Sequence, residues 1–175
     1  MRRTSFENTN SSMARSLEIV GDWWTLLIVR DAFMGVRRFD DFQEHLGIAR
    51  NILASRIRRL VSFEILERQL YQVRPKRYEY VLTDSGRDLK TVLFSIKQWG
   101  DRNLYEGKEH PLSIAHKGCG AEISVDIICP KCNEVLSDNH EKLDWIAGTD
   151  MSDDDKRVYT QFRENSYFRG ADSDA

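Results

Sequence analysis

The chain has 175 residues, of which 41% are hydrophobic and 31% charged, a composition that is typical of a globular protein and excludes a disordered or membrane-embedded one. The formal net charge of −2 hides an asymmetry, because residues 1–110 carry 19 Lys and Arg against 15 Asp and Glu, whereas residues 111–175 carry 7 against 13. The longest apolar run, residues 23–29, is far shorter than the ~20 residues of a membrane span, and no stretch resembles a signal peptide. We therefore expect a cytoplasmic protein whose N-terminal part can meet a polyanion.

Three helices are predicted before residue 47. Ser12–Val20 has its apolar residues on one helical face, and Asp22 is a suitable N-cap for a second helix over Trp23–Phe33. This second helix is apolar nearly all round, which is typical of a helix buried at the centre of a domain. Phe39–Leu46 is predicted as a short third helix, and Gly47 as a tight connection to the segment that follows.

Residues 47–61, GIARNILASRIRRLV, contain four arginines and no acidic residue. Leu53, Ile57 and Leu60 share one face of a helix, because their spacing is i, i+4, i+7. The opposite face carries residue types that pair with bases and phosphates in the major groove, namely Arg50, Asn51, Ser55, Arg58 and Arg59. Taken alone, the segment fits a solvated amphipathic helix equally well. Its place after a short helix and a glycine turn predicts the second helix of a helix-turn-helix.

A β-hairpin is predicted after this helix, from strands over Leu66–Gln72 and residues 77–83. Pro75 lies between them and favours a loop. Three basic residues lie at or beside the tip, namely Arg74, Lys76 and Arg77. A basic hairpin in this position is typical of a wing whose tip reaches phosphates or the minor groove. The alternative is a solvated hairpin that happens to be basic.

A long helix is predicted over residues 86–105. Its apolar stripe consists of Leu89, Val92, Leu93, Ile96 and Trp99. The stripe is more apolar surface than a small domain can cover, so we expect these residues, with Leu17 of the first helix, to form a dimer interface. The alternative is that the stripe packs on the helices of its own chain.

Several ordered motifs between about Ser11 and Leu104 resemble the HxlR-type family of bacterial winged helix-turn-helix transcription factors. They include WTLL from Trp24, GVRRF from Gly35, and RYEY from Arg77 followed by LTDSG from Leu82. The resemblance implies a homodimer, formed by the first and last helices of the core, that binds a palindromic operator and represses or activates genes; we favour a repressor. Many members of the family have a redox-sensing cysteine where this chain has Ser11. Because residues 1–110 contain no cysteine, a thiol switch in this domain is excluded.

Two close pairs of potential metal ligands follow the core. The spacing is H-x2-C, nine residues, then C-x2-C, formed by His116, Cys119, Cys129 and Cys132. Three thiolates and one imidazole fit a closed, structural zinc site rather than a catalytic one, and residues 121–128 between the pairs alternate like a strand. The alternatives are an empty site, a Cys129–Cys132 disulfide, or reduced structural cysteines.

The predicted fold class is therefore mainly α with a small β-hairpin wing, followed by a small zinc-ribbon-like module and a short helix after residue 152. The corresponding domains are residues 11–106 for DNA binding and dimerisation, residues 107–137 for the zinc-ribbon-like module, and residues 138–175 for the linker, short helix and tail.

The predicted function is sequence-specific binding of double-stranded DNA. We assign Arg50, Asn51, Ser55 and Arg58 to bases, and the wing residues above to the minor groove or phosphates. The residues assigned to phosphates are Arg37, Arg38, Arg56 and Arg59. The alternative is a metal-stabilised protein–protein adaptor that uses the winged helix as a docking surface.

We do not expect an enzyme. The chain has no Gly-rich phosphate loop and no nucleophile elbow, and His45, His110 and His140 are expected to be isolated surface residues. A further hypothesis is a small-molecule effector site between the core and the long helix, near Trp23, Trp24 and Trp99; the alternative is that these aromatic residues are plain core.

Overall fold

The computed structural model describes residues 5–6, 9–105 and 112–136, with a few single positions beyond residue 147. The chain divides into two units, residues 1–123 and residues 124–175. The helices and strands, in chain order, are α1 (Ser12–Val20), α2 (Trp23–Phe33), α3 (Phe39–Leu46), α4 (Arg50–Ser62), β1 (Leu66–Gln72), β2 (Arg77–Leu82), α5 (Asp84–Asp88) and α6 (Lys90–Leu104).

Local capping explains where the first two helices begin. The Ser11 hydroxyl accepts a hydrogen bond from the backbone N–H of Ala14 at the start of α1. The Asp22 carboxylate accepts one from the N–H of Trp24 at the start of α2, as the sequence predicts. These bonds satisfy donors that the first turn of a helix leaves without a partner.

The second helix, α2, lies at the centre of the domain, which confirms the prediction. It contacts α1, α3, α4, α6 and β2. The buried apolar core is formed by Ile28, Val29, Phe42, Ile48, Leu53, Ile57, Leu60, Ile65 and Leu66. Not all of α2 is buried, however: Trp23 at its start is exposed.

A sharp turn joins α3 to α4. Gly47 at the end of α3 has φ 61° and ψ 21°, a left-handed conformation that glycine adopts without steric cost. The chain then reverses into α4, whose Leu53, Ile57 and Leu60 are buried as their spacing predicts. The pair α3–α4 is the expected helix-turn-helix.

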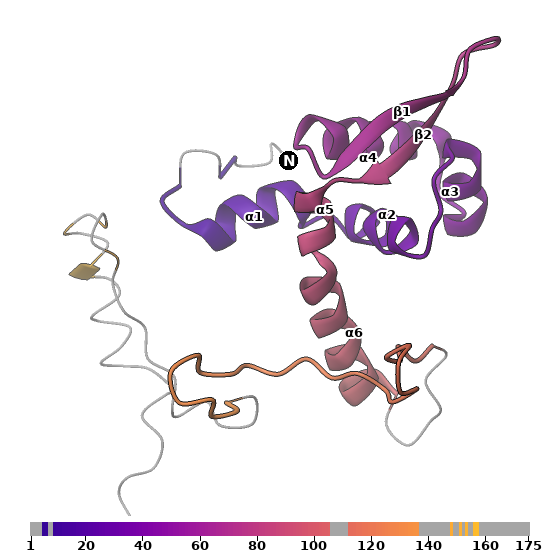
Figure 1. Ribbon diagram of the computed structural model, residues 1–175. Helices are drawn as coiled ribbons and strands as arrows, with labels where there is room; N and C mark the ends of the chain where they lie inside the picture. The colour runs from indigo at the N-terminus through magenta and orange to yellow at the C-terminus, as the bar shows by residue number, and fades with distance from the viewer. Residues whose placement is uncertain are drawn as a thin grey trace, which may run out of the picture. The chain divides into compact units, whose positions relative to one another are not determined.

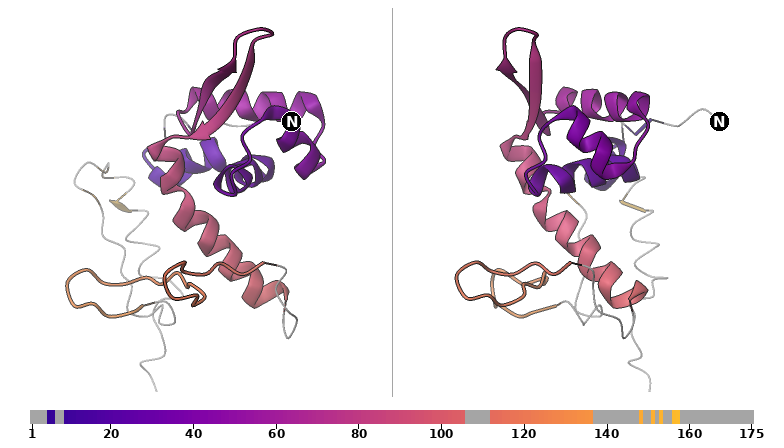
Figure 2. Two further views of the ribbon diagram at one scale, coloured as in Figure 1. Left: turned by 45° about the vertical axis from the view of Figure 1, so that its right-hand side comes forward. Right: turned by 90° about the vertical axis from the view of Figure 1, so that its right-hand side faces the viewer.

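The hairpin β1–β2 is antiparallel, with Leu66 opposite Leu82 and Arg68 opposite Tyr80. It projects from the helical body with its tip pointing away from α5 and α6 (Figure 1). In the turned views of Figure 2, the hairpin rises beside α4, while α5 and α6 follow from its base and α6 extends in the opposite direction. This arrangement is a helix-turn-helix followed by a wing.

The prediction of a single helix over residues 86–105 is wrong in one respect. The structure has two helices there, α5 and α6, with a break at Leu89. The Thr83 side chain caps α5 by accepting from the N–H of Gly86 at 3.0 Å. Gly86 lies so close to the wing that a Cβ atom there would sit 2.2 Å from the Ile65 carbonyl oxygen. This contact holds α5 against the core, and α6 begins only after Leu89 has packed there.

Past the core, the structure describes two short turns between residues 112 and 136. The predicted strand over residues 121–128 is wrong, because each of its ends forms only a single bridge within its own turn, Ala115 with Glu122 and Ile128 with Val135. The short helix predicted after residue 152 lies mostly outside the described residues. None of the described helices is long and apolar enough to cross a membrane.

Candidate nucleic-acid interface

One face of α4 carries the predicted base-reading residues. Arg50, Asn51, Ser55 and Arg58 are all exposed, whereas the opposite face is buried in the core. Burial of one face therefore fixes which side chains α4 presents to solvent. The presented set combines guanidinium groups that donate two hydrogen bonds with an amide that can both donate and accept.

The two arginines of this face make only exchangeable surface contacts within the chain. The Arg50 guanidinium lies 4.7 Å from the centroid of the Phe39 ring and donates to the carboxylate of Asp40 at 3.1 Å, with 69% of its side chain exposed. Arg58 donates from Nε to the Ala54 carbonyl at 3.2 Å. Exposed contacts of this kind are weak, so a phosphate or base can replace them.

Two other arginines of α4 are directed toward their own fold. Arg56 makes two hydrogen bonds to Asp22, from Nε at 2.9 Å and from Nη2 at 2.8 Å, and both side chains are mostly buried. Arg59 donates to the Glu18 carbonyl at 2.6 Å and lies near the Glu18 carboxylate. These pairs join α4 to α1 and to the start of α2.

The turn before α3 is attached to the wing. The Arg37 carbonyl accepts from the N–H of Tyr80 at 2.8 Å, and the guanidinium of Arg38 lies 4.9 Å from the centroid of the Tyr71 ring. The Arg37 guanidinium is 3.9 Å from the carboxylate of Glu79 and mostly exposed. Both arginines are therefore held at the junction of α3 and the hairpin.

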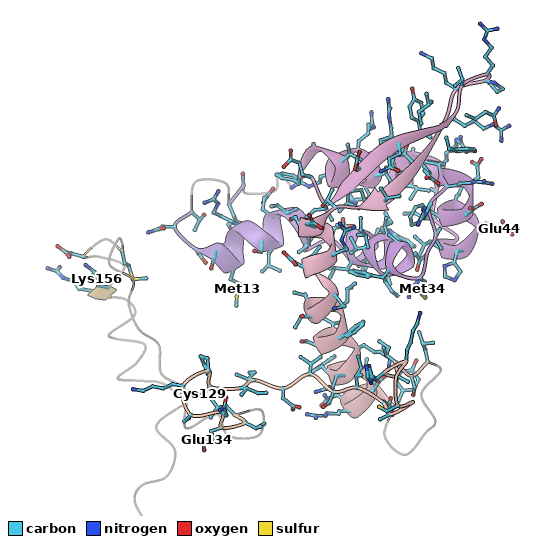
Figure 3. All side chains as sticks on the ribbon, viewed as in Figure 1. Met13, Met34, Glu44, Cys129, Glu134 and Lys156 are labelled. Atoms are coloured by element: carbon cyan, nitrogen blue, oxygen red, sulfur yellow. The ribbon has the colours of Figure 1, made fainter. Side chains whose placement is uncertain are left out.

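At the wing tip, Arg74, Lys76 and Arg77 are all exposed, as predicted. Gln72 donates from Nε2 to the Arg74 carbonyl at 3.0 Å, which orders the turn between the strands. Figure 3 shows side chains projecting outward around this tip, well beyond the helical body.

A further arginine, Arg68, was missed by the sequence analysis. It lies on β1 opposite Tyr80, and its guanidinium is 3.9 Å from the centroid of the Tyr78 ring. With Arg58 of α4, it lines a cavity of about 460 Å³ between α4 and the wing. Strand alternation places residue 68 on the same face of β1 as Leu66, which packs toward the helices, so that pattern could have identified it.

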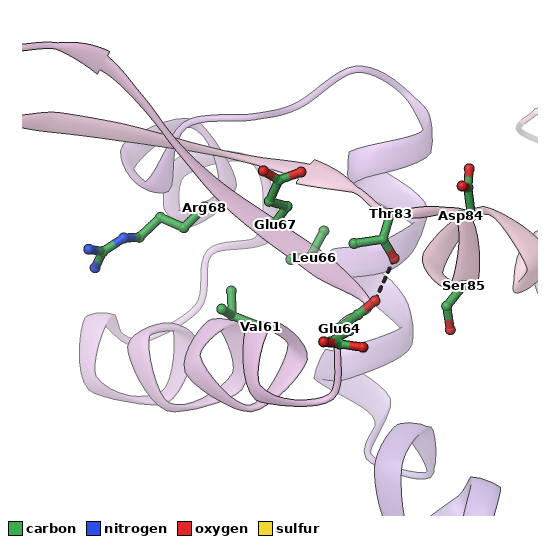
Figure 4. A pocket seen from close by; sticks show the side chains of 8 residues that line it. All are labelled: Val61, Glu64, Leu66, Glu67, Arg68, Thr83, Asp84 and Ser85. Atoms are coloured by element: carbon green, nitrogen blue, oxygen red, sulfur yellow. Dashed lines mark hydrogen bonds between the residues drawn. The ribbon is translucent and has the colours of Figure 1, made fainter.

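The base of the wing has the opposite charge. Glu64, Glu67 and Asp84 line a hollow of about 540 Å³ together with Arg68, and the Thr83 hydroxyl donates to the Glu64 carbonyl (Figure 4). In Figure 4 the Arg68 side chain extends away from Glu64 and Asp84. Three carboxylates repel phosphate, so this end of the wing is not part of a polyanion-binding surface.

The predicted dimer residues fall into two groups. Leu89 and Leu93 pack against the core of their own chain. Four apolar side chains on α1 and α6 are 43–60% exposed, namely Leu17, Val92, Ile96 and Trp99. A mainly apolar cavity of about 660 Å³ lies beside this face, between α2 and α6, and is also lined by Leu112 and Ile114.

The predicted metal ligands lie in two separate turns. In the first, Nδ1 of His116 is 3.3 Å from Sγ of Cys119. In the second, backbone N–H groups of Cys132 and Lys131 hydrogen-bond the Cys129 thiol and lower its pKa. The described residues contain no group of three or more His, Cys, Asp or Glu side chains that could hold a metal ion.

His45 is not isolated, contrary to expectation. Its Nδ1 lies 2.7 Å from Oδ2 of Asp31, whose side chain is fully buried in α2. The other carboxylate oxygen of Asp31 accepts two hydrogen bonds from Arg30, at 2.7 and 2.9 Å. The three residues form a polar contact that joins α3 to α2.

Comparisons with known proteins agree with this geometry. The profile of the HxlR-like helix-turn-helix family matches residues 19–108. The chain is 43% identical over 126 residues to an uncharacterized HTH-type transcriptional regulator of Mycobacterium tuberculosis, an alignment that covers 72% of this chain and 80% of the relative.

Two solved structures are also similar. PA1607, described as a candidate transcription factor, is 33% identical with a TM-score of 0.73, and the match covers 84% of this chain and 100% of that one. PA1374 from Pseudomonas aeruginosa, described in the same way, is 36% identical with a TM-score of 0.60, and the match covers 85% and 99%.

Proposed function

Because the chain belongs to the HxlR-like helix-turn-helix family, we propose that it is a homodimeric repressor that reads a palindromic operator in double-stranded DNA. Like its relatives, the chain is a helix-turn-helix transcription regulator and not an enzyme. One observation carries the finer proposal: α4 buries one face completely and presents Arg50, Asn51, Ser55 and Arg58 on the other.

In the proposed complex, α4 enters the major groove and the wing follows the adjacent backbone. Arg50, Asn51, Ser55 and Arg58 contact base edges. The residues that contact phosphates or the minor groove are Arg37, Arg38, Arg68, Arg74, Lys76 and Arg77. We leave Arg56 and Arg59 out of this set, because their ion pairs with Asp22 and Glu18 give them a role in the fold.

The proposed dimer is supported by α6. This helix has 15 residues and an apolar stripe, yet none of its residues is buried. Ile96 and Trp99 are 50% and 60% exposed, and Leu17 of α1 is 52% exposed. Covering these side chains with the same face of a second copy removes apolar surface from water and sets two copies of α4 against two half-sites. Occupancy of an operator that overlaps a promoter then represses transcription.

A small-molecule effector stays a prediction. It is supported by the cavity between α2 and α6, which is lined by Trp23, though not by Trp24 or Trp99, and whose volume of about 660 Å³ is in the size range of ligand sites. A ligand there would touch α2, which contacts α4, and α6, which we assign to the dimer.

The test is a binding titration on the DNA upstream of the gene, at several salt concentrations. We expect Arg58→Ala to weaken binding to the operator by about 10- to 100-fold and to relax its sequence preference, since a bidentate base contact contributes about 1–3 kcal/mol. Lys76→Ala should weaken binding to all sequences and reduce the slope of log K against log salt by about 0.9.

The matched control is Lys90→Ala, which removes one positive charge from the exposed start of α6 and should leave DNA binding unchanged. If the wild-type protein shows no salt-dependent affinity for duplex DNA, the operator proposal is wrong and the adaptor hypothesis is favoured.

Oligomeric state is tested separately, by sedimentation of Ile96→Glu. We expect a folded monomer, whereas Lys90→Glu on the opposite face of α6 should remain a dimer. If Ile96→Glu sediments as the wild type does, the dimer does not use this face.

A further inference from the structure

The two turns that carry the histidine and cysteines have the same backbone hydrogen bonds. In the first, the N–H of Gly120 donates to the His116 carbonyl and the N–H of His116 donates to the Ala121 carbonyl, both at 2.8 Å. In the second, Asn133 donates to the Cys129 carbonyl, and Cys129 donates to the Glu134 carbonyl, both at 2.9 Å. In each turn, the potential ligands occupy the first and fourth positions.

The correspondence continues on both sides of each turn. Gly120 and Asn133, which follow the second ligand directly, both have positive φ, at 73° and 59°. The bridge of Ala115 with Glu122 matches the bridge of Ile128 with Val135. A constant offset of 13 residues relates every one of these positions, so residues 114–123 and 127–136 are two copies of one small hairpin.

The first hairpin also brings its two ligands to a suitable distance. Bond lengths of about 2.0–2.1 Å to nitrogen and 2.3 Å to sulfur place two ligands of a tetrahedral zinc ion about 3.5 Å apart. The observed separation of His116 Nδ1 and Cys119 Sγ is 3.3 Å. Gly118 leaves room for the imidazole, because a Cβ atom at that position would lie 2.9 Å from the His116 ring.

The hairpins have no apolar core of their own. No residue between 112 and 136 is buried, and the larger apolar side chains Ile123, Ile127, Ile128 and Val135 are all exposed. Burial of apolar surface therefore contributes little to holding two regular hairpins of this size. A bound metal provides the missing folding energy in small domains of this kind.

We propose that residues 112–136 form a structural zinc site in which each hairpin supplies two ligands, His116 and Cys119 from the first and Cys129 and Cys132 from the second. Three thiolates and one imidazole suit zinc rather than magnesium or calcium, which prefer oxygen ligands. Binding displaces the three thiol protons to solvent. Because four protein groups complete a tetrahedron, no position remains for a substrate and the site is not catalytic. This inference does not depend on DNA binding.

The test is metal analysis of the purified full-length chain together with cobalt(II) titration of the metal-free protein. We expect about one zinc per chain, and visible absorption typical of tetrahedral cobalt bound by thiolates. Zinc should be lost from Cys119→Ser, Cys132→Ser and His116→Ala alike. His116→Cys should restore it, because a fourth thiolate also completes the set.

The matched control is Lys131→Ala, which changes a side chain between Cys129 and Cys132 that has no part in the donor set, and which should retain full zinc. The proposal is overturned if the wild type contains no zinc and binds no cobalt in a tetrahedral site. It is also overturned if His116→Ala and Cys119→Ser keep the full zinc content while Cys132→Ser loses it, because the first hairpin would then supply no ligand. If a serine variant fails to fold, the zinc contents of His116→Ala, His116→Cys and Lys131→Ala still show whether the first hairpin supplies a ligand.

Discussion

The core over residues 9–105 and the two hairpins over residues 112–136 differ in how they are stabilised. The core buries ten apolar residues, which come from α1, α2, α3, α4, β1 and the segments between them, and its polar pairs join one helix to the next. The hairpins bury none of their residues, yet they repeat one hydrogen-bond pattern twice. The difference teaches that an ordered backbone does not by itself reveal which interaction stabilises a region. The core is stabilised by burial of apolar side chains, and we propose that the hairpins are stabilised by a bound metal.

Removing zinc from the protein should have the largest effect and should separate the two regions completely. Apparent binding energies of structural zinc in small domains are about 10–16 kcal/mol, so a chelator should leave the hairpins unfolded. Hydrogen exchange of the backbone N–H groups of Ile123 and Leu136 should then rise to the rate of an unstructured chain, whereas the amides of α2 and α4 keep their protection. Adding zinc back is the control. Hairpin amides that stay protected without metal would contradict the comparison.

A cavity in the core should act on the core alone. Ile28 of α2 is fully buried, so Ile28→Ala should lower the free energy of unfolding by about 2–5 kcal/mol. Urea denaturation followed by tryptophan fluorescence measures this, because Trp24 packs against the core. The zinc content of the folded variant should remain at about one per chain. A variant that loses zinc while its core is still folded would show that the hairpins depend on the core after all.

The sequence predicted those helices whose bounds are set by residues close to them along the chain. The bounds of α1, α2 and α3 follow from apolar period, a capping Ser11 or Asp22, and a glycine turn, all of which are local. The break between α5 and α6 was not predicted, because it lies at Leu89, which packs against the core, a contact made only in the folded chain.

The same limit applies to the candidate site. Spacing placed Arg50 and Arg58 on the exposed face of α4 correctly, since burial of the other face decides it. Spacing could not show that Arg56 is bound by Asp22, which lies 34 residues away along the chain. The position of Arg68 beside Arg58 likewise depends on the register of the wing against α4.

Substitutions of Arg56 and Arg58 should affect different properties of the protein, although the two residues are only two positions apart on α4. Arg56→Ala removes two charged hydrogen bonds to Asp22, and partial exposure limits the expected loss of stability to about 1–2 kcal/mol. DNA affinity should change little. Arg58→Ala should leave stability within about 0.5 kcal/mol and weaken operator binding. Denaturation and DNA titration of both variants decide this, and an Arg56→Ala protein of normal stability that binds DNA poorly would return Arg56 to the interface.

The smallest effect is expected from Ile127→Ala, which makes the same isoleucine-to-alanine change as Ile28→Ala but in the second hairpin. Ile127 is 56% exposed, whereas Ile28 is fully buried, so Ile127→Ala leaves no cavity and should change stability by less than about 0.5 kcal/mol. Its zinc content should equal that of the wild type, because the backbone carbonyl of Ile127, which accepts from the N–H of Leu136, is unchanged by the substitution. Metal analysis and urea denaturation measure the two quantities on one preparation. A loss of zinc in Ile127→Ala would mean that apolar contacts, and not the metal alone, hold the second hairpin, and the contrast between the two regions would then be one of degree.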